Sequence, residues 1–551
     1  MNPEYNTGFI KQSHILDRAI IILKQIFSIK NLDKIQLITH KELKAKEEGK
    51  VMEDHNSDDL IKALQRTYNF NKIHFWLNGE PLTAEIPPAQ TTLEFLHNNQ
   101  HLYGTKCSCN EGDCGACTVV IAQVKEGNIV YEAINSCLYT AAKLNGKHLI
   151  TIEGLGTLEQ LHPIQQVMLE NHSLQCGYCS PGFVMSLFAL LANTSHPEEE
   201  EILSALEGNL CRCASYQSIL RAAKELSANF TFNDIVPAWC RDIEKQLFSF
   251  KDTSKMIEKS GNLLFPCSQY IVPQKLSELT DILANIPEAV FIAGGTDVMV
   301  RMNVQKEEIP VLIDLSELQE LKQIQYTNRG IIISAGVTYS DILHSGIIKT
   351  DLPCLYVLVK KIASRQIRNI ATLAGNIANA SPIGDTLPLL LVLDASLTLF
   401  SSTGIRELPL RDFFLDYRKT RLQQNELIKG IMIPIPAKET FIRTQKAAKR
   451  KAVDISSVVS AIKIETNSGK IKEAKLAFGG VAPIPKLSYN FSELLMEKPG
   501  EEINPIEIAE IVADEFNPIS DVRGSKEYRQ ILIRNQVLNY LQEYVQGGSN
   551  A

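Results

Sequence analysis

The sequence predicts a multidomain protein of the α+β class. Its 551 residues are enough for roughly three or four domains of ordinary size. Residues from about 72 to 153 show the apolar–polar alternation of strands, whereas residues 157–230 repeat apolar side chains at the helical spacing. Beyond about residue 263, strand and helix patterns are mixed and are separated by glycine turns. Three patterns in succession indicate domains of different architecture.

The composition is typical of a folded globular protein. Apolar residues make up 44% of the chain, charged residues 22%, and the formal net charge is −7. This negative charge argues against nucleic acid or an anionic membrane as a partner, and no apolar run is long enough to cross a bilayer. The apolar segment Arg18–Phe27 lacks the cleavage site of a signal peptide. We therefore expect a cytoplasmic location.

Changes of pattern along the chain give the expected boundaries. Residues 1–70 are rich in Lys, Glu and Asp, carry no recognisable motif and form an extension of unknown role. The boundaries expected for the rest are 71–153 for a small β-rich domain, 154–232 for a helical domain, 233–262 for a charged linker, 263–437 for a mixed domain and 438–548 for a C-terminal subdomain.

Local signals predict the elements of the first two domains. Residues 72–86 alternate around an Asn-Gly pair and predict a hairpin, and residues 91–100 predict a short helix capped by Thr. Residues 117–124 and 128–137 read as strands. Four segments with helical spacing follow, at residues 157–173, 180–194, 198–211 and 216–229.

Cysteines are concentrated in these two domains. Nine of the twelve lie between Cys107 and Cys213. A secreted disulfide scaffold would be short and evenly supplied with Cys, and this chain is neither. Local crowding of thiols in a reducing compartment favours metal ligation.

The first group has the spacing C-x4-C-x2-C followed by a distant cysteine, and consists of Cys109, Cys114, Cys117 and Cys137. This is the plant-type ferredoxin arrangement for a [2Fe–2S] cluster, in which each of two irons takes two thiolates. Gly112 and Gly115 allow the loop to turn sharply and bring N–H groups near the sulfurs. A zinc site or a thioredoxin-like pair is the alternative, although only the C-x2-C portion fits either. Cys107 breaks the spacing and is expected not to be a ligand.

The second group has the pattern C-x2-C, a gap of 31 residues and C-x-C, and consists of Cys176, Cys179, Cys211 and Cys213. Because helical segments lie on both sides, we expect these cysteines in the turns between helices. On spacing alone, zinc remains an alternative here.

Taken together, the two cysteine motifs resemble the iron–sulfur part of the molybdenum hydroxylase (xanthine oxidase) family. The family forms are E-G-x-C-G-A-C-T, Q-C-G-F-C-T-P-G and C-R-C-T-G-Y, and this chain has EGDCGACT, QCGYCSPG and CRCASY. The resemblance implies two [2Fe–2S] clusters, the first in a β-grasp, plant-type ferredoxin-like domain and the second in a four-helix domain. It also implies that Gln175 lies near a molybdenum cofactor held by a partner chain. The family's Gly and Pro beyond Cys213 are absent.

A second pair of motifs lies in the mixed domain. Residues 291–300 form a strand pattern that ends in Gly294-Gly295, and paired glycines can expose N–H groups to a phosphate, although such a pair is more often a plain turn. The Rossmann G-x-G-x-x-G pattern is absent, so a Rossmann site is not supported.

With residues 363–385, ASRQIRNIATLAGNIANASPIGD, these glycines resemble the FAD-binding domain of the same family. The resemblance implies that residues 290–297 line the FAD pyrophosphate. It places the ring system near Ile362 and a basic residue, Lys446, near the flavin, and it puts Ala374 where the family has Gly. The other implied contacts are Ile292, Ala293, Gly294, Gly295, Thr296, Asp297, Thr372, Gly375, Asn376 and Asp385. Residues 438–548 resemble the C-terminal subdomain of CO dehydrogenase flavoproteins.

The resemblance covers about residues 72–545 and implies electron carriers without a site for substrate oxidation. We therefore expect no catalytic acid, base or nucleophile on this chain, and a hetero-oligomer with a large molybdenum-cofactor subunit that hydroxylates a purine. Electrons would pass through the second cluster, the first cluster and FAD to NAD⁺ as co-substrate. An oxidoreductase acting on aldehydes or other N-heterocycles, a stand-alone NADH-oxidising carrier and a zinc-binding, non-redox scaffold are the alternatives.

The cysteine assignment predicts different outcomes for two neighbouring substitutions. Cys107→Ser should leave the first cluster intact, whereas Cys109→Ser should lose it, because only Cys109 fits the ligand spacing. Iron analysis and the visible spectrum of each variant measure this. Full iron content in the Cys109→Ser protein would contradict the assignment.

Overall fold

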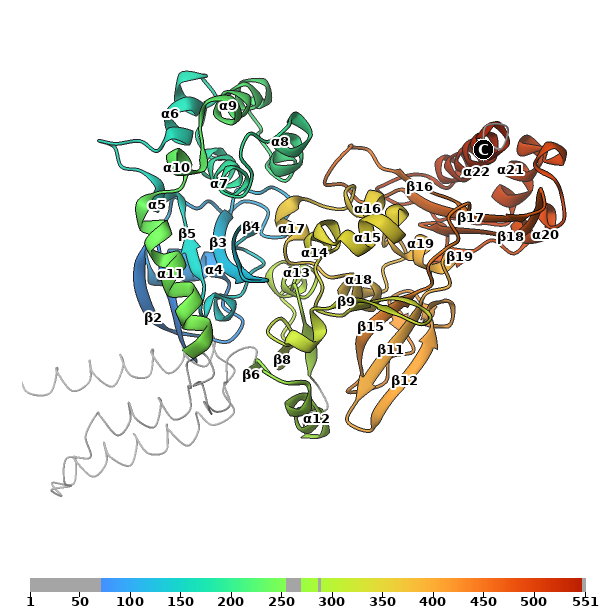
Figure 1. Ribbon diagram of the computed structural model, residues 1–551, viewed down its shortest axis with the longest axis horizontal. Coiled ribbons are helices and arrows are strands. Elements are labelled where there is room, and N and C mark those ends of the chain that lie inside the picture. The colour runs from blue at the N-terminus through green and yellow to red at the C-terminus, as the bar shows by residue number, and fades with distance from the viewer. Residues whose placement is uncertain (1–70, 254–268, 286–288, 548–551) are drawn as a thin grey trace, which may run out of the picture. The chain divides into compact units, whose positions relative to one another are not determined.

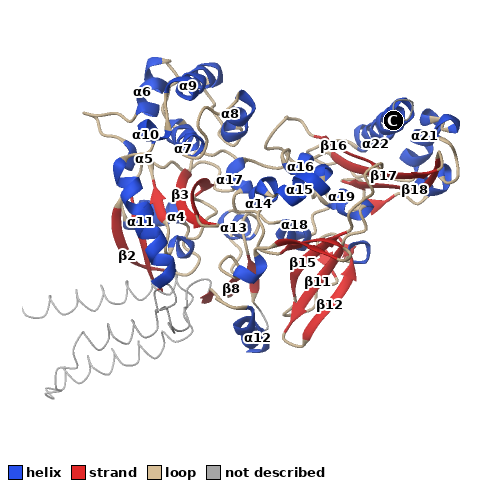
Figure 2. Cartoon of the chain, in the orientation of Figure 1, coloured by secondary structure: helices blue, strands red, loops and turns tan. Residues whose placement is uncertain are grey.

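The computed structural model describes residues 71–253, 269–285 and 289–547 (Figure 1). The extension expected at residues 1–70 lies outside these ranges. The described chain alternates helical and sheet regions, as Figure 2 shows. None of its helices combines the length and the apolar character that a membrane crossing requires.

The first region is a five-stranded mixed sheet with the order β2-β1-β5-β3-β4. The predicted hairpin is present, with its Asn-Gly turn at positive φ, and β5 pairs parallel to β1. Thr91 caps the short helix that crosses the sheet, as predicted. This is the expected β-grasp fold. Its elements are β1 (Asn71–Leu77), β2 (Glu80–Ile86), α4 (Thr92–Glu94), η2 (Phe95–Asn99), β3 (Thr118–Lys125), β4 (Asn128–Asn135), η3 (Ala141–Leu144) and β5 (His148–Ile150).

Strand β3 is buried on both faces. Val119 and Ile121 face one hydrophobic core with the short helix, while Val120 and Ala122 face a second core formed with the helices that follow. A strand covered on both sides reads as a continuous apolar run, which is the pattern of residues 119–122. The β-grasp sheet and the helical region therefore pack as neighbours.

The helical region contains the four predicted helices. Helix α7 is its centre, because every residue from Gly182 to Leu191 is buried. The elements are α5 (Ile152–Leu155), α6 (Pro163–Glu170), α7 (Ser180–Leu191), α8 (Glu199–Leu206), α9 (Tyr216–Asn229) and α10 (Phe232–Ile235).

The segment predicted as a charged linker differs from that expectation over its described part. It forms a 16-residue helix, α11 (Ala238–Thr253), that runs beside the β-grasp sheet (Figure 1). Cys240, Ile243 and Leu247 are buried at helical spacing, and Gln246 accepts a 3.1 Å hydrogen bond from the Trp76 indole. Charged residues such as the exposed Asp242 and Lys245 alternate with these apolar positions, so the apolar stripe was hidden in the overall composition.

The mixed region contains a three-stranded parallel sheet, β6-β8-β7, and a five-stranded antiparallel sheet, β12-β11-β15-β10-β9. One large core lies between the second sheet and the helices. The strands are β6 (Gln269–Ile271), β7 (Val290–Ile292), β8 (Val311–Asp314), β9 (Ile324–Thr327), β10 (Gly330–Ser334), β11 (Ser396–Ser401), β12 (Gly404–Pro409), β13 (Phe414–Asp416), β14 (Lys419–Thr420) and β15 (Leu427–Ile433). The helices are α12 (Leu276–Asn285), α13 (Val298–Asn303), η5 (Gln319–Leu321), α14 (Tyr339–His344), α15 (Gly346–Asp351), α16 (Pro353–Val359), α17 (Arg365–Arg368), α18 (Leu373–Asn379), α19 (Leu387–Val392) and η6 (Leu410–Asp412).

The last region is a four-stranded antiparallel sheet, β16-β17-β18-β19, covered by helices over a core of its own. Its elements are β16 (Phe441–Ala447), β17 (Val458–Asn467), β18 (Lys470–Gly479), β19 (Lys486–Leu487), α20 (Asn490–Leu495), η7 (Gly500–Glu502), α21 (Pro505–Asp514) and α22 (Lys526–Gly547).

The packing of α11 predicts the effect of truncating one apolar side chain. Ile243→Ala should lower the free energy of unfolding by about 2–4 kcal/mol, because the side chain is 4% exposed and leaves a cavity. Phe248→Ala, on the exposed side of the same helix, should change it by less than about 0.5 kcal/mol. The sequence holds only two tryptophans, Trp76 in β1 and Trp239 in α11, so urea unfolding followed by tryptophan fluorescence reports on this interface. Equal losses in both variants would contradict the docking of α11.

Candidate functional site: two thiol groups and a glycine-rich turn

The four cysteines of the first group come together as two pairs at one end of the β-grasp sheet. Cys109 and Cys114 lie in the loop before β3, and the thiol of Cys114 donates a hydrogen bond to the Cys109 sulfur. The sulfur atoms of Cys117 and Cys137 are 3.3 Å apart and buried. Because each iron of a [2Fe–2S] cluster takes two thiolates, two adjacent pairs fit such a cluster.

The loop surrounds the Cys109 sulfur with hydrogen-bond donors. The hydrogen bond from the Cys114 thiol, together with those from the backbone N–H groups of Glu111, Cys114 and Asp113, lowers the pKa of Cys109 to about 5. Donors of this kind stabilise negative charge on a ligand sulfur. Gly112 and Gly115 have φ of +87° and +66°, so the sharp turns expected at these glycines are present.

The second group also forms two pairs. Cys176 and Cys179 lie in the turn before α7, and Cys211 and Cys213 lie between α8 and α9, as expected for turns between helices. Hydrogen bonds join the Cys176 side chain to Cys213 and the Cys179 side chain to Cys211.

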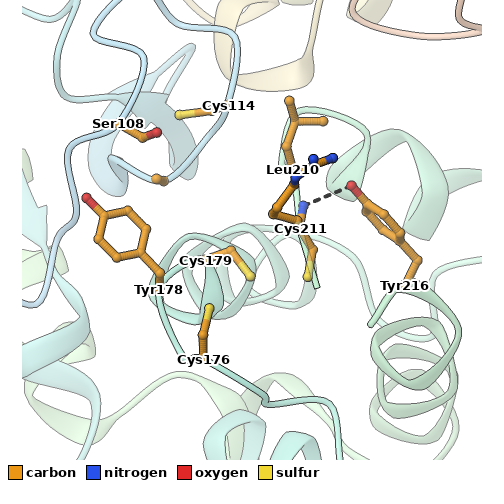
Figure 3. A pocket seen from close by; sticks show the side chains of 10 residues that line it. Ser108, Cys114, Cys176, Tyr178, Cys179, Leu210, Cys211 and Tyr216 are labelled. Atoms are coloured by element: carbon orange, nitrogen blue, oxygen red, sulfur yellow. Dashed lines mark hydrogen bonds between the residues drawn. The ribbon is translucent and has the colours of Figure 1, made fainter. Parts of the chain in front are cut away.

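Around this second group, the Cys211 amide donates a 2.8 Å hydrogen bond to the Tyr216 hydroxyl, which holds the C-x-C turn against the start of α9 (Figure 3). Gln175 is exposed beside the group and donates to the Cys213 carbonyl at 3.2 Å.

A cavity of about 390 Å³ joins the two groups of cysteines. Cys114 lines it from the first loop, and Cys176, Cys179 and Cys211 line it from the helical region (Figure 3). The amide of Leu210 donates directly to the Cys114 carbonyl at 2.9 Å. The two groups of cysteines are therefore neighbours in space, although the bonded residues Cys114 and Leu210 lie 96 residues apart in the sequence.

The thiols are arranged two by two rather than around a common centre. Within the ranges that the structure covers, no three His, Cys, Asp or Glu side chains are gathered so that they could hold one metal ion. Each iron of a [2Fe–2S] cluster needs two thiolates from the protein, and bridging sulfides complete its shell. The residues present therefore fit two such clusters.

A buried asparagine connects both cysteine segments to the mixed region. Asn209 donates to the Gly115 carbonyl at 3.0 Å, and its own oxygen accepts from Ser186 at 2.7 Å and from Gln366 at 3.0 Å. All three side chains are at most 2% exposed. Both amide atoms of Asn209 therefore have partners, and a satisfied buried amide fixes the relative placement of the segments that it joins.

The approach at this junction is close enough to exclude a side chain at Gly115. A Cβ at this position would lie 2.3 Å from the Gly208 carbonyl oxygen, and the positive φ adds strain for any other residue.

The glycine pair of the mixed region lies at the carboxyl end of β7. Gly294 touches the chain just before α18, since a Cβ there would lie 2.1 Å from the Ile370 carbonyl oxygen. Through the described chain, the amides of residues 294–297 have no hydrogen-bond acceptor. Successive free N–H groups at the carboxyl end of a parallel strand form a suitable cradle for a phosphate group. These residues fit the pyrophosphate of FAD.

The other residues expected to contact FAD lie along α18 and beside it. Thr372 caps this helix by accepting from the Gly375 amide at 3.0 Å, and Asn376 accepts from the Thr386 hydroxyl at 2.8 Å. The neighbouring Asp385 forms a 2.7 Å ion pair with Lys446, and both side chains are largely buried.

Lys446 also links this pair to the position expected near the ring system. Its ammonium group lies 3.4 Å from the Lys361 carbonyl, next to the buried Ile362. Ala374, the departure from the family pattern, is 5% exposed within α18.

The first group of cysteines is packed directly against residues 293–297, which we call the glycine-rich turn. Cys117 and Cys137 share one apolar core with Ile292 and Met299, which flank residues 293–298. Asn303 donates to the Cys137 carbonyl at 2.7 Å. The three candidate sites therefore lie in a row in space: the second group of cysteines, the first group of cysteines and the glycine-rich turn.

Reasoning from the sequence missed the polar residues at these contacts, namely Asn209, Gln366 and Asn303. Asn209 stands directly before the Leu210-Cys211 pair, and Gln366 lies within the FAD-type motif. The available signal was a polar residue without an assigned role inside or beside a motif. The hydrogen-bond partners of these three residues could not be inferred, because they lie 94 to 166 residues away in the chain.

Four family models match the chain. They are the 2Fe-2S iron-sulfur cluster binding domain over residues 75–141, the [2Fe-2S] binding domain over 151–224, the FAD binding domain in molybdopterin dehydrogenase over 266–436 and the CO dehydrogenase flavoprotein C-terminal domain over 443–544. Xanthine dehydrogenase of Blastobotrys adeninivorans is 31% identical over 85% of this chain. The chain belongs to the molybdenum hydroxylase family. It carries that family's iron–sulfur and FAD-binding domains.

Further relatives include aldehyde oxidase 2 of Rattus norvegicus, 29% identical over 86% of this chain. The chain spans about 40% of the length of these two relatives. Among solved structures, quinoline 2-oxidoreductase from Pseudomonas putida 86 is 26% identical, with a TM-score of 0.47 over 50% of this chain and 96% of that chain.

The donors around Cys109 predict its reactivity in the iron-free chain. Because the pKa of Cys109 is lowered to about 5, the thiolate persists at pH 6.5 and disappears only as the pH falls through about 5. Iodoacetamide at pH 6.5 should therefore alkylate Cys109 before Cys354, whose pKa burial raises to about 11. Peptide mapping by mass spectrometry measures both. Equal labelling of the two cysteines would show that the loop donors do not act on Cys109.

Proposed function

We propose that this chain is the electron-transfer subunit of a xanthine dehydrogenase-type enzyme. In this proposal it corresponds to the small iron–sulfur/FAD subunit of the bacterial two-subunit form. It passes electrons from a molybdenum cofactor on a partner chain, through two [2Fe–2S] clusters, to FAD and then to NAD⁺. The observation that carries the proposal is that the three candidate sites contact one another in sequence. Cysteines of both groups line one cavity, and the first group shares an apolar core with the residues that flank the glycine-rich turn.

In this proposal the eight paired cysteines hold the clusters. The second cluster belongs to Cys176, Cys179, Cys211 and Cys213, and the first to Cys109, Cys114, Cys117 and Cys137. The loop amides around Cys109 stabilise added negative charge on the first of these sites. No acid, base or nucleophile of this chain takes part in chemistry on a substrate.

The FAD-binding residues are proposed to be the glycine-rich turn, α18 and the buried Lys446–Asp385 pair. Free amides of residues 294–297 face the pyrophosphate, and Lys446 supplies a cation beside the flavin. FAD, when bound, accepts single electrons and returns them in pairs as hydride to a nicotinamide. The chain's own residues bind and orient it.

The exposed surface around the second thiol group supports a partner subunit. Gln175 and Cys176 are exposed there, so an electron donor can approach this end of the chain. Large apolar side chains are also exposed in the same helical region, namely Leu158, Leu161, Leu169, Leu174, Tyr178, Leu203, Leu210 and Tyr216. Three of them, Tyr178, Leu210 and Tyr216, line the cavity beside the second group of cysteines, and exposed apolar groups gathered at one place mark interaction surfaces. We propose that a large subunit with the molybdenum cofactor covers them and forms a hetero-oligomer.

An aldehyde or another N-heterocycle is the second candidate for the partner's substrate. Relatives named xanthine dehydrogenase and aldehyde oxidase match this chain with similar identity, 31% and 29%. A role in purine breakdown and a cytoplasmic location, the latter inferred from the reduced thiols that the clusters need, belong to the proposal in its xanthine dehydrogenase form.

The visible absorption spectrum of the purified chain, recorded anaerobically before and after NADH is added, tests the proposal. Bleaching of both flavin and iron–sulfur bands is expected, because reducing equivalents entering at FAD reach both clusters. Bleaching by dithionite but not by NADH would remove NAD from the proposal and leave the three centres. A colourless protein would point to the zinc scaffold instead.

A further inference from the structure

A buried lysine of the β-grasp domain reaches into the strand ends of the FAD-binding domain. Lys143 belongs to η3, six residues after Cys137, and its side chain is 4% exposed. Its ammonium group donates to the Ala293 carbonyl and lies 3.5 Å from the Asp314 carboxylate, which is 1% exposed. A buried cation is held in place only when acceptors surround it, so this contact is specific in geometry.

The acceptor side of this contact is itself fixed by hydrogen bonds. The Tyr270 hydroxyl donates to Asp314 at 2.6 Å and accepts from the Thr140 hydroxyl at 2.8 Å. The amide of Ser316 also donates to Asp314, at 2.9 Å. Lys143 and Thr140 of the β-grasp domain therefore join Tyr270 and Asp314 of the FAD-binding domain in one network of polar contacts.

The position of Ala293 gives this network a consequence for ligand binding. Ala293 follows β7 directly and precedes Gly294, while Asp314 ends the neighbouring parallel strand β8. In a trans peptide the C=O and the following N–H point in opposite directions. Lys143 draws the Ala293 oxygen toward the β-grasp domain and so turns the Gly294 N–H away from it. That N–H is the first of the four amides that have no acceptor in the described chain.

The β-grasp domain also approaches Gly295 of the same turn closely. Gly295 has φ +83°, and a Cβ there would lie 3.3 Å from the carbonyl oxygen of Leu138, the residue after Cys137. The segment from Cys137 to Lys143 therefore lies against the glycine-rich turn at two places, Ala293 and Gly295.

We propose that Lys143 is a positioning residue that sets the pyrophosphate-binding turn of the FAD domain from across the domain boundary. The inference rests on the proposed function, since it takes residues 294–297 as the pyrophosphate site. It makes FAD affinity depend on a residue of the iron–sulfur domain. Lys143 itself does not touch FAD.

The test compares three full-length variants with the wild-type chain. Lys143→Met removes the ammonium group and keeps the length of the side chain, and Lys143→Met with Asp314→Asn also removes the carboxylate charge that would otherwise be left unpaired. The matched control is Lys147→Met. Lys147 lies at the same interface with its side chain 12% exposed, and it pairs with Glu317 at 3.5 Å and with the Tyr139 hydroxyl at 2.9 Å. No contact joins it to Ala293 in the described chain.

Dissociation constants for FAD and for riboflavin, which lacks the phosphates, are measured by fluorescence titration after release of the bound flavin. We expect both Lys143 variants to bind FAD about tenfold or more weakly and riboflavin as the wild type does, with Lys147→Met unchanged for both. Iron content and the electron paramagnetic resonance signals of both clusters verify that each variant is folded.

Unchanged FAD affinity in the double variant would overturn the inference while the proposed function stands. Equal weakening by Lys147→Met, or equal loss of riboflavin and FAD binding, would also overturn it, because a general loosening of the interface would then be the cause. A wild-type chain that binds no flavin would instead remove the proposed function, and the inference with it.

Discussion

The hydrogen-bonded junction at Asn209 is the contact on which the arrangement of the three candidate sites depends. One amide side chain joins the first cysteine loop through Gly115, the second cysteine motif through its own place in the chain, and the FAD-binding domain through Gln366. Burial removes water as a competing partner, so losing any one of these bonds would leave an unsatisfied polar group. The close approach at Gly115 and the direct bond from Leu210 to Cys114 follow from this junction.

The domains that carry the three candidate sites are packed together through buried apolar and polar contacts. The first group of cysteines lines one cavity together with the second group. It also shares an apolar core with the residues that flank the glycine-rich turn. Lys143 and Asn303 add contacts from opposite sides of the domain boundary. If the domains moved independently, the distances between these sites would not stay constant. The fold thus holds the three candidate sites in a row.

Local patterns in the sequence were sufficient for much of this fold. The Asn-Gly hairpin, the Thr91 cap and the four helices of residues 163–229 follow from short-range rules, and the structure contains all of them. Cysteine spacing indicated metal ligation, because ligand geometry constrains residues close together in the chain. The resemblance of the cysteine and FAD-type motifs implied the molybdenum hydroxylase family, and the family models confirm it. The cofactor ligands themselves stay a prediction.

Contacts between distant segments could not be predicted in the same way. The bond between Asn209 and Gln366 spans 157 residues and that between Lys143 and Ala293 spans 150, and no local period encodes such pairs. Helix α11 is an intermediate case. Its buried Cys240, Ile243 and Leu247 have helical spacing, but the surrounding charges made the segment resemble a linker.

Metal, sulfide and flavin analysis of the purified chain is the most direct test of the central claim that one chain holds three redox centres. If the eight paired cysteines bind two [2Fe–2S] clusters, iron and acid-labile sulfide should be present in equal amounts, two of each for each cluster, together with one FAD and no zinc. Zinc in place of iron, without sulfide, would contradict the claim.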